Sequence, residues 1–301
     1  MILVVGDAIL DVDRRFTTTR MCPEKADAPV LTPLHAEAEM RLGGALNVWN
    51  AIRQLGVECD VISSLGNDQG GALVAQMMGY PPAENDGTTN PTTVKERIYV
   101  DGVLKFRMDT DRGPETDAVY EGIDEDVEKR LRSKKVDLLV LSDYGKGVLA
   151  RPQRMIRVAV ELGIPVIVDP KGADWQRYEG ATVLKPNFYE ETGHAYEPDV
   201  HFKVITDGAY GMRVLGGGLD STIYGIPRKT VDVTGAGDMA CAALAVCLAK
   251  RKGLPSGADV VRAARVANVL ASASVEYQGV KTFTRKEAEN ECRKHGVAFS
   301  V

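Results

Sequence analysis

The sequence predicts an α/β protein built on a mainly parallel sheet, with a small antiparallel β lobe beside it. Short, β-branched apolar runs alternate with helical patterns through the first two-thirds of the 301-residue chain. Such alternation is typical of strands joined by right-handed helical crossovers. One region breaks the pattern, because two alternating segments flank Asp101-Gly102, a strong signal for a two-residue hairpin turn.

The expected strands of the main sheet are short and apolar on both faces, as buried parallel strands are. They are residues 2–5, 61–63, 138–141, 166–168, 183–184 and 204–206. The expected helices between them are residues 47–55, 72–78, 124–133 and 152–162. Two longer Ala-rich segments, residues 236–250 and 258–277, predict helices that close the C-terminal part of the fold. Residues 81–91 and 193–198 are predicted loops.

The lobe is predicted from the hairpin, residues 95–100 and 103–108, and from an extended stretch at residues 28–40. We expect a single domain over residues 1–301, with segments near 12–42 and 93–110 forming a lid suited to cover a site. A regular two-residue turn would place Arg97 opposite Phe106, with Lys95 on the same face and Arg107 on the other.

Composition excludes several classes of function. The net charge is −5, and no Lys/Arg-rich block offers a surface for nucleic acid. No apolar run approaches the roughly 20 residues needed to cross a bilayer. The five cysteines form no CxxC pair, and the N-terminal apolar run lacks a basic leader. We therefore expect a cytoplasmic protein with reduced thiols that binds neither nucleic acid nor membrane.

The segment Val231-Asp-Val-Thr-Gly-Ala-Gly-Asp238 carries the most chemical information. Small residues at the start of a helix expose backbone N–H groups, which together with the helix dipole can hold a phosphate. A carboxylate at that place, Asp238, could accept a proton from an incoming hydroxyl. Taken alone, the segment fits equally well a tight turn in which Asp238 is an ordinary acid of the first helical turn.

Other segments favour a site for ligands. Asp7 and Asp11 follow the first strand, at the sheet edge where ligands collect in open α/β folds. Gly43 and Gly44 precede a helix and would let the backbone and Asn47 approach a ligand. Asn187 and Glu190 lie one helical turn apart and could share a hydrated Mg²⁺, while residues 204–211 form a strand and a glycine-spaced turn suited to a nucleotide.

In this order, these segments resemble the ribokinase-like (PfkB) carbohydrate kinases over nearly the whole chain. Both signatures of that family are present, at residues 43–56 and 232–238, and neither a P-loop nor a GxGxxG fingerprint occurs. The resemblance implies a three-layer α/β/α domain, ATP and Mg²⁺ as cofactors, in some relatives K⁺, and a homodimer paired through the lid strands.

A narrower resemblance is to the D-glycero-D-manno-heptose-7-phosphate kinase branch of that family. It rests on Gly6-Asp-Ala-Ile-Leu-Asp11, Cys22-Pro-Glu24, Ser142-Asp-Tyr-Gly-Lys-Gly147 and Val168-Asp-Pro-Lys-Gly172. The branch implies phosphorylation of the anomeric hydroxyl of a sugar 7-phosphate. No HxGH motif occurs, so we expect no nucleotidyltransferase activity in this chain.

The resemblance also implies roles for individual residues. Asp238 would be the base, with Gly235, Ala236 and Gly237 as an anion hole. Substrate would be held by Asp11, Gly43, Gly44, Asn47, Lys95, Arg107, Asp143 and Lys146. ATP would contact Asn187, Thr206, Gly208, Gly211 and Asn268. Glu190 would serve Mg²⁺ through water, and Asp232 and Thr234 a monovalent cation.

Two alternatives remain open from the sequence. A ribokinase-like kinase for another sugar, such as fructose, ribose or a 2-keto-3-deoxy sugar acid, would not need the phosphate-binding cations. A catalytically idle protein kept for binding sugar or nucleotide would bind its ligand without releasing ADP.

Overall fold

The structure, a computed structural model, describes residues 1–35, 38–80, 90–133, 135–249 and 253–299. The chain divides into two compact units. Unit 1 comprises Met1–Asp7, Gly44–Ser64 and Thr116–Val301, and unit 2 comprises Ala8–Gly43 and Leu65–Glu115. The predicted lobe segments, near residues 12–42 and 93–110, fall within unit 2.

Unit 1 is built on an eight-stranded sheet in the order β13-β12-β11-β10-β9-β8-β1-β5. The six strands from β5 to β11 run parallel, and β12 and β13 add an antiparallel edge. Their bounds are β1 Ile2–Gly6, β5 Cys59–Ile62, β8 Leu138–Ser142, β9 Val166–Asp169, β10 Val183–Leu184, β11 Phe202–Thr206, β12 Gly211–Gly216 and β13 Leu219–Tyr224. The predicted α/β class with a mainly parallel sheet is confirmed.

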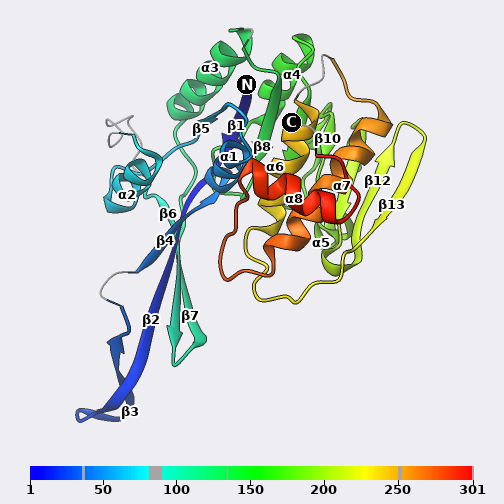
Figure 1. Cartoon of the computed structure of the whole chain (residues 1–301). Coiled ribbons are helices and arrows are strands. Elements are labelled where there is room, and N and C mark those ends of the chain that lie inside the picture. Colours follow the sequence, from blue (N-terminus) through cyan, green and yellow to red (C-terminus); the bar gives the residue numbers. More distant parts are fainter. Residues whose placement is uncertain (36–37, 81–89, 134, 250–252, 300–301) are drawn as a thin grey trace. The chain divides into compact units, whose positions relative to one another are not determined.

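Helices lie on both faces of this sheet (Figure 1). One set, α3 and α4, packs together, and α6 packs against both α1 and α7 in the other. The bounds are α1 Ala45–Gln54, α3 Asp117–Arg132, α4 Pro152–Glu161, α5 Phe188–Gly193, α6 Ala236–Leu248, α7 Gly257–Ser274 and α8 Arg285–Lys294. The Ala-rich sequence of α6 has a structural reason, since small side chains let this buried helix approach α7 closely.

Among its described residues, unit 2 holds a five-stranded sheet and one helix. Its strands are β2 Ala8–Cys22, β3 Lys25–Pro33, β4 Glu39–Gly44, β6 Thr93–Val100 and β7 Val103–Thr110, and its helix is α2 Gln69–Met78. The order is β3-β2-β6-β7, and β4 also pairs with β2. The β3–β2 and β6–β7 pairs are antiparallel as expected, but β2 and β6 run parallel. A parallel pair needs a long crossover, and the chain between these strands, which includes α2, provides one.

The hairpin register differs from the predicted one. Val100 pairs with Val103 across the Asp101-Gly102 turn, but Ile98 pairs with Phe106, so Lys105 is an extra residue in a β-bulge. The prediction that Arg97 faces Phe106 is therefore wrong. Arg97 is directly opposite Arg107, and Lys95 is opposite Asp109, which places all four side chains on one face of the hairpin.

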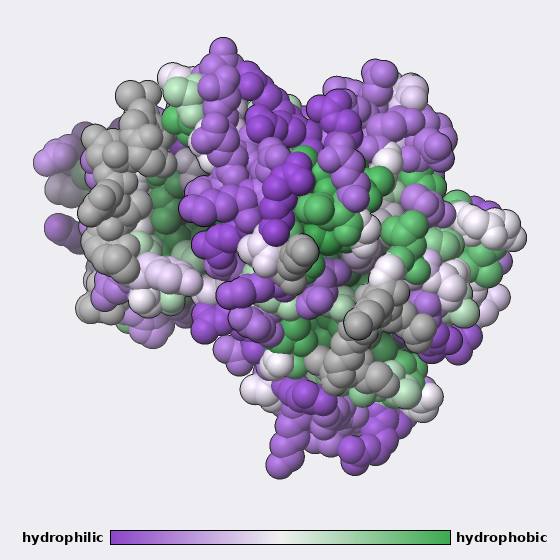
Figure 2. All heavy atoms as spheres, turned by 90° about the horizontal axis from the view of Figure 1, so that it is seen from above, coloured by the Kyte–Doolittle hydropathy of each residue, from purple (hydrophilic) through white to green (hydrophobic). Residues whose placement is uncertain are grey.

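Most predicted elements occur within a few residues of their expected bounds. The sequence did not reveal β2, β12, β13, α5 or α8, and residues 81–89 of one predicted loop lie outside the described residues. No helix in the described ranges is long and apolar enough to cross a membrane. Figure 2 shows a face on which hydrophilic side chains predominate and hydrophobic ones gather in separate patches.

Candidate active site

A cavity of about 220 Å³ lies where neighbouring parallel strands of unit 1 end. Because parallel strands end at the same edge of a sheet, the residues at or just after their last positions come together there. Asp143 follows β8, Asp169 ends β9, Lys185 follows β10 and Thr206 ends β11. All four line the cavity, together with Asp238 from α6.

Asp238 is buried, and both of its carboxylate oxygens accept hydrogen bonds. The side-chain amide of Asn47 donates to Oδ2 at 2.6 Å, and the hydroxyl of Tyr144 donates to Oδ1 at 2.5 Å. Burial, reinforced by the charge of Asp238, raises the pKa of Tyr144 well above its usual value. Tyr144 therefore stays a protonated donor, and the carboxylate is fixed in one orientation at the start of α6.

An ion pair between Asp169 and Lys185 lies in the same cavity, with 3.0 Å between Nζ and Oδ1. Burial raises the pKa of Asp169 to about 6, against the attraction of Lys185 and with the help of the charge on Asp238. The pKa of Lys185 is also raised, because the attraction of Asp169 and other acidic groups outweighs desolvation. The cavity therefore holds a buried ammonium that keeps its charge at neutral pH.

Asn187 and Glu190 lie on the cavity wall and form a capping box at the start of α5. Asn187 Oδ1 accepts from the backbone N–H of Glu190 at 2.9 Å, and Glu190 Oε2 accepts from the backbone N–H of Asn187 at 3.0 Å. Glu190 Oε1 accepts from Lys171 Nζ at 3.0 Å. The predicted pair is thus brought together, with both oxygens of Glu190 already engaged by protein donors.

The turn before α6 has the geometry of an anion-binding helix start. Gly235 is the N-cap in a left-handed conformation at φ 77°, and a Cβ there would lie 3.0 Å from the amide nitrogen of Asn47. Gly235 and Gly237 both line the cavity. The N–H of Ala236 instead donates to the carbonyl of Val233 at 3.2 Å, so this member of the predicted anion hole has an acceptor within the protein.

The loop that carries Tyr144 is anchored by Asp7. The Asp7 carboxylate accepts from the backbone N–H groups of Tyr144 at 2.8 Å, Lys146 at 3.0 Å and Val148 at 3.0 Å. Asp143 caps the same loop, accepting from the N–H of Gly145 at 2.7 Å and from the hydroxyl of Tyr178 at 2.7 Å. Asp143 lines the cavity, as predicted for a site residue, whereas Lys146 is not among the residues that line it.

The other predicted nucleotide and cation residues of unit 1 lie outside the cavity lining, except Thr206. Asn268 is buried and donates its amide to the carbonyl of Tyr224 at 2.9 Å, which fixes the end of β13. Gly208 and Gly211 flank a short 3₁₀ turn, both with positive φ.

The carboxylate of Asp232 organises the loop before α6. It accepts from Thr234, from both the backbone N–H at 2.9 Å and the hydroxyl at 2.7 Å. It also accepts from Gln278 at 3.0 Å and from the N–H of Gly279 at 2.9 Å. Asp232 and Thr234 therefore lie together, as expected.

In unit 2, Asp11 is buried and forms an ion pair with Arg97 at 2.8 Å. A Cβ at Gly43 would lie 2.2 Å from Asp11 Oδ2, so glycine is required for this approach. Arg107 is bound through two nitrogens to Asp109, at 2.8 and 2.6 Å. The predicted cation Arg107 is thus engaged by a neighbouring carboxylate, and Arg97 of the same hairpin contacts Asp11.

Sequence reasoning missed four polar or charged residues that line the cavity: Tyr144, Asp169, Lys171 and Lys185. The sequence did contain a signal for these residues, because each lies at the end of a predicted parallel strand or in the loop directly after one, where ligands bind in open α/β sheets. Three of them stand in segments that supported only the family resemblance.

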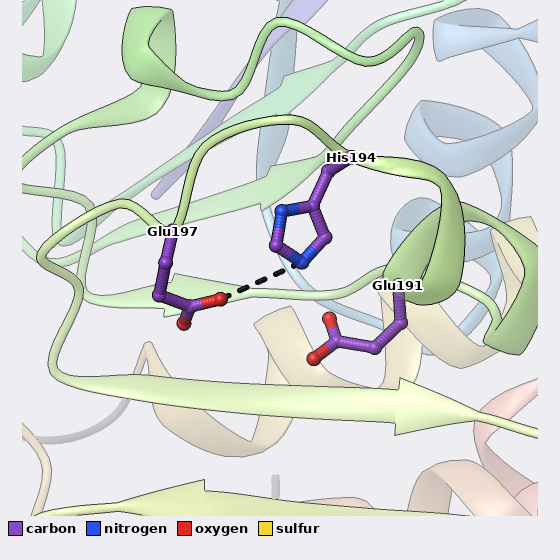
Figure 3. A group of neighbouring side chains, drawn as sticks. All are labelled: Glu191, His194 and Glu197. Carbon is purple, nitrogen blue, oxygen red and sulfur yellow. Dashed lines mark ion pairs between the residues drawn. The ribbon is translucent and has the colours of Figure 1, made fainter.

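A second group of titratable side chains, Glu191, His194 and Glu197, is drawn in Figure 3. The imidazole lies with its Nε2 3.5 Å from a Glu197 oxygen, and both glutamates turn toward the same point. The ammonium of Lys203 binds there, 2.8 Å from an oxygen of each glutamate. Since Lys203 already balances these carboxylates, we assign the group a structural role.

Comparison with solved structures defines the class first, because the chain has a ribokinase-like fold. A ribokinase from Giardia lamblia superposes with a TM-score of 0.74 at 16% identity, covering 98% of both chains. A phosphofructokinase-2 from Escherichia coli, in complex with potassium, gives a TM-score of 0.71 at 20% identity, covering 98% of this chain and 99% of the other.

Sequence comparison then gives the family. The family model described as pfkB family carbohydrate kinase matches residues 124–287, more than half of the chain, so the chain belongs to the pfkB family of carbohydrate kinases. Among curated relatives, proteins named Bifunctional protein HldE from Cronobacter sakazakii and Pectobacterium carotovorum are 33% and 34% identical over 97% of this chain. The chain spans 63% of the length of these relatives. The expected family membership is confirmed.

Proposed function

We propose that this chain transfers the γ-phosphoryl group of ATP to a sugar hydroxyl, with Asp238 as the base. The observation that carries the proposal is the position of the Asp238 carboxylate. It lies at the start of α6, beside Gly235 and Gly237, in a cavity that also holds a charged lysine. A helix start binds a phosphate, and a carboxylate fixed beside it can take the proton of the attacking hydroxyl.

The chemistry asked of the protein is mainly positioning and charge stabilisation. Hydrogen bonds from Asn47 and Tyr144 fix the orientation of the Asp238 carboxylate. Neither side chain therefore needs to move when the carboxylate accepts the proton of the sugar hydroxyl. We propose that the ammonium groups of Lys185 and Lys171 and the N–H groups at the helix start, which border the same cavity, stabilise the negative charge that develops on the phosphoryl group. As the oxygen of the sugar hydroxyl bonds to phosphorus, the bond between phosphorus and ADP breaks and the hydroxyl proton moves to Asp238.

The cavity's oxygen-rich lining fits the hydrated Mg²⁺ that accompanies ATP. Mg²⁺ prefers carboxylate oxygens and retains several waters, and both oxygens of Glu190 are engaged by protein donors. Contact through water therefore suits Glu190 and Asn187 better than direct ligation. When bound, the ion would neutralise phosphate charge. A K⁺ requirement, with Asp232 and Thr234 near the ion, stays a prediction that replacing K⁺ with Na⁺ would test.

For the acceptor, we propose the anomeric O1 of D-glycero-D-manno-heptose 7-phosphate, with the 1,7-bisphosphate as product. The support is the resemblance in the segments that carry Asp7, Asp11, Asp143 and Asp169, together with the similarity to proteins named HldE. We propose that Asp11 binds sugar hydroxyls and that cations of the β6–β7 hairpin bind the substrate phosphate. Arg97, Arg107 and Lys95 share one face of that hairpin. All three could therefore contact the same phosphate, whereas the predicted register would have placed Arg107 on the opposite face.

The test is ADP release with Mg·ATP and a panel of acceptors: heptose 7-phosphate, ribose, fructose, fructose 6-phosphate and a 2-keto-3-deoxy sugar acid. We expect selective turnover of heptose 7-phosphate, reduced about 10²- to 10⁴-fold in Asp238→Asn, the usual contribution of a positioned base. Turnover of another sugar would retain the kinase and reject the heptose. Bound ATP without turnover of any acceptor would favour the idle binding protein.

We also propose that two copies pair through unit 2. The edge strand β7 exposes Val103, Leu104, Phe106 and Met108, each about half or more exposed, and uncovered apolar edge strands invite pairing. We expect a dimer by light scattering, and a monomer after Phe106→Ser. A wild-type monomer at micromolar concentration would reject the proposal.

A further inference from the structure

A groove of about 530 Å³ in unit 1 is lined by four arginines and lies apart from the catalytic cavity lining. We call it the arginine groove and define it by Arg151, Arg154, Arg157 and Arg177, with Asp124 and Asp174. Its walls are the first two turns of α4 and the 3₁₀ turn η1 (Gln176–Tyr178). A hydrogen bond from the Gln153 amide to the carbonyl of Gln176, at 2.9 Å, joins the two walls.

One arginine of the groove remains open to an anion. Four guanidinium groups and two carboxyl groups line the groove, and Arg151 pairs outside it with Asp117. Arg154 is bound by Asp124 at 3.8 Å and by Glu128 at 3.2 Å. In the described part of the chain, Arg157 is exposed and has no ion-pair or hydrogen-bond partner. Three residues apart on α4, Arg154 and Arg157 are neighbours on one helix face.

Arg177 is only partly paired within the protein. Its Nη2 lies 3.4 Å from Asp143 Oδ2, and its buried Nε lacks a hydrogen-bond partner among the described residues. Its guanidinium also lies over the ring of Tyr178, with 5.4 Å to the centroid. Arginine groups arranged around a hollow of this size bind phosphate oxygens well, because a planar guanidinium can donate two parallel hydrogen bonds.

The same arginine connects the groove to the catalytic cavity. Asp143, its partner, lines that cavity and caps the loop from which Tyr144 reaches Asp238. An anion that attracts Arg177 would weaken the Arg177–Asp143 pair. The carboxylate would then lose the positive charge that opposes the rise in its pKa from burial.

We propose that the arginine groove is a second binding site, for a small molecule that carries a phosphate group, and that its occupancy alters the catalytic cavity through Arg177 and Asp143. The binding statement stands on the groove alone. The statement about catalysis rests on the proposed kinase function.

The test uses the whole chain and two probes, pyrophosphate and glucose 6-phosphate, titrated calorimetrically into wild-type protein, Arg157→Gln and Arg265→Gln. Arg265 is the matched control, an exposed arginine on α7 with no partner within the described ranges. We expect Arg157→Gln to weaken binding of at least one probe about tenfold, the usual worth of a charge-assisted hydrogen bond, and Arg265→Gln to leave it unchanged. Equal binding by all three proteins, or equal weakening in both variants, would overturn the proposal.

A kinetic measurement separates the two statements. The probe that binds the groove should change the sugar KM or the kcat of wild-type protein. Because the probe can also compete with ATP, only the part of the change that is absent in Arg157→Gln counts as an effect of the groove. If groove binding is found and wild type and Arg157→Gln respond alike, the coupling through Arg177 is rejected. If no acceptor supports ADP release, the proposed function fails while the calorimetric result still decides the groove.

Discussion

Tyr144→Phe is the sharpest perturbation of the candidate site. The change removes one oxygen atom, and with it the 2.5 Å hydrogen bond to Oδ1 of Asp238, while Asn47 still donates to Oδ2. The ring keeps its packing. The carboxylate therefore stays in place but loses a donor that favours its ionised form.

The size of the effect follows from the kind of bond. A hydrogen bond to a charged group contributes about 1.5 to 3 kcal/mol, and about 1.4 kcal/mol corresponds to one pH unit in proton affinity. The pH at which turnover is half-maximal on the acidic side should therefore rise by about 1 to 2 units. The sign is fixed, because a lost donor makes the carboxylate easier to protonate and the base is lost at higher pH.

The assay is ADP release from pH 5 to pH 9 with saturating acceptor, for wild type, Tyr144→Phe and Tyr189→Phe. Tyr189 is 83% exposed and serves as the matched control. On the alkaline plateau, Tyr144→Phe should keep most of its turnover, unlike Asp238→Asn. An unmoved acidic limb in Tyr144→Phe would refute the reasoning, as would a loss of turnover at all pH values equal to that of Asp238→Asn.

Three further predictions follow from single contacts. Burial raises the pKa of Asp169 to about 6, so the native protein binds this proton more tightly than the unfolded chain. Between pH 4 and pH 7, the free energy of unfolding in urea should fall in wild type relative to Asp169→Asn, by up to about 3 kcal/mol. The same pH dependence in both proteins would contradict the raised pKa of Asp169. Gly43→Ala places a Cβ against the Asp11 carboxylate and should raise the sugar KM about tenfold, with an unchanged KM counting against the role of Asp11. Gly211→Ala meets the carbonyl of Ile223 from a backbone with φ 106°, and should lower the free energy of unfolding by about 1 to 3 kcal/mol in urea titration, whereas no loss would mean that the turn relaxes.

The main sheet could be predicted because its parallel strands are buried on both faces and so appear as short apolar runs. β12 and β13 escaped prediction for a physical reason. Gly217 and Gly218, both with positive φ, form the turn between these strands. Much of β13 is exposed, so neither composition nor apolar periodicity marked it. α8 escaped because it is highly charged and buries only one side.

The sequence predicted those residues of the candidate site that stand in recognisable sequence segments. Asp238, Gly235, Asn187 and Glu190 lie in recognisable segments and meet at the cavity. The place of Lys185 directly after a predicted strand indicated the sheet edge, but its ion pair with Asp169 of the neighbouring strand depends on a distance that only the fold determines.

The bulge at Lys105 sets the face of the hairpin on which each later side chain of β7 lies. If Lys105 were drawn into regular pairing, β7 would shift by one residue against β6, and every side chain from Phe106 onward would exchange faces. Arg107 would then leave the face of Arg97 without any residue being replaced. Deleting Lys105 would instead keep Phe106 opposite Ile98 and Arg107 opposite Arg97, because the residue that is lost is the one without a partner across the hairpin. The charge pattern of this strand therefore tolerates a one-residue deletion at the bulge, whereas the same deletion elsewhere in β7 would rewrite it.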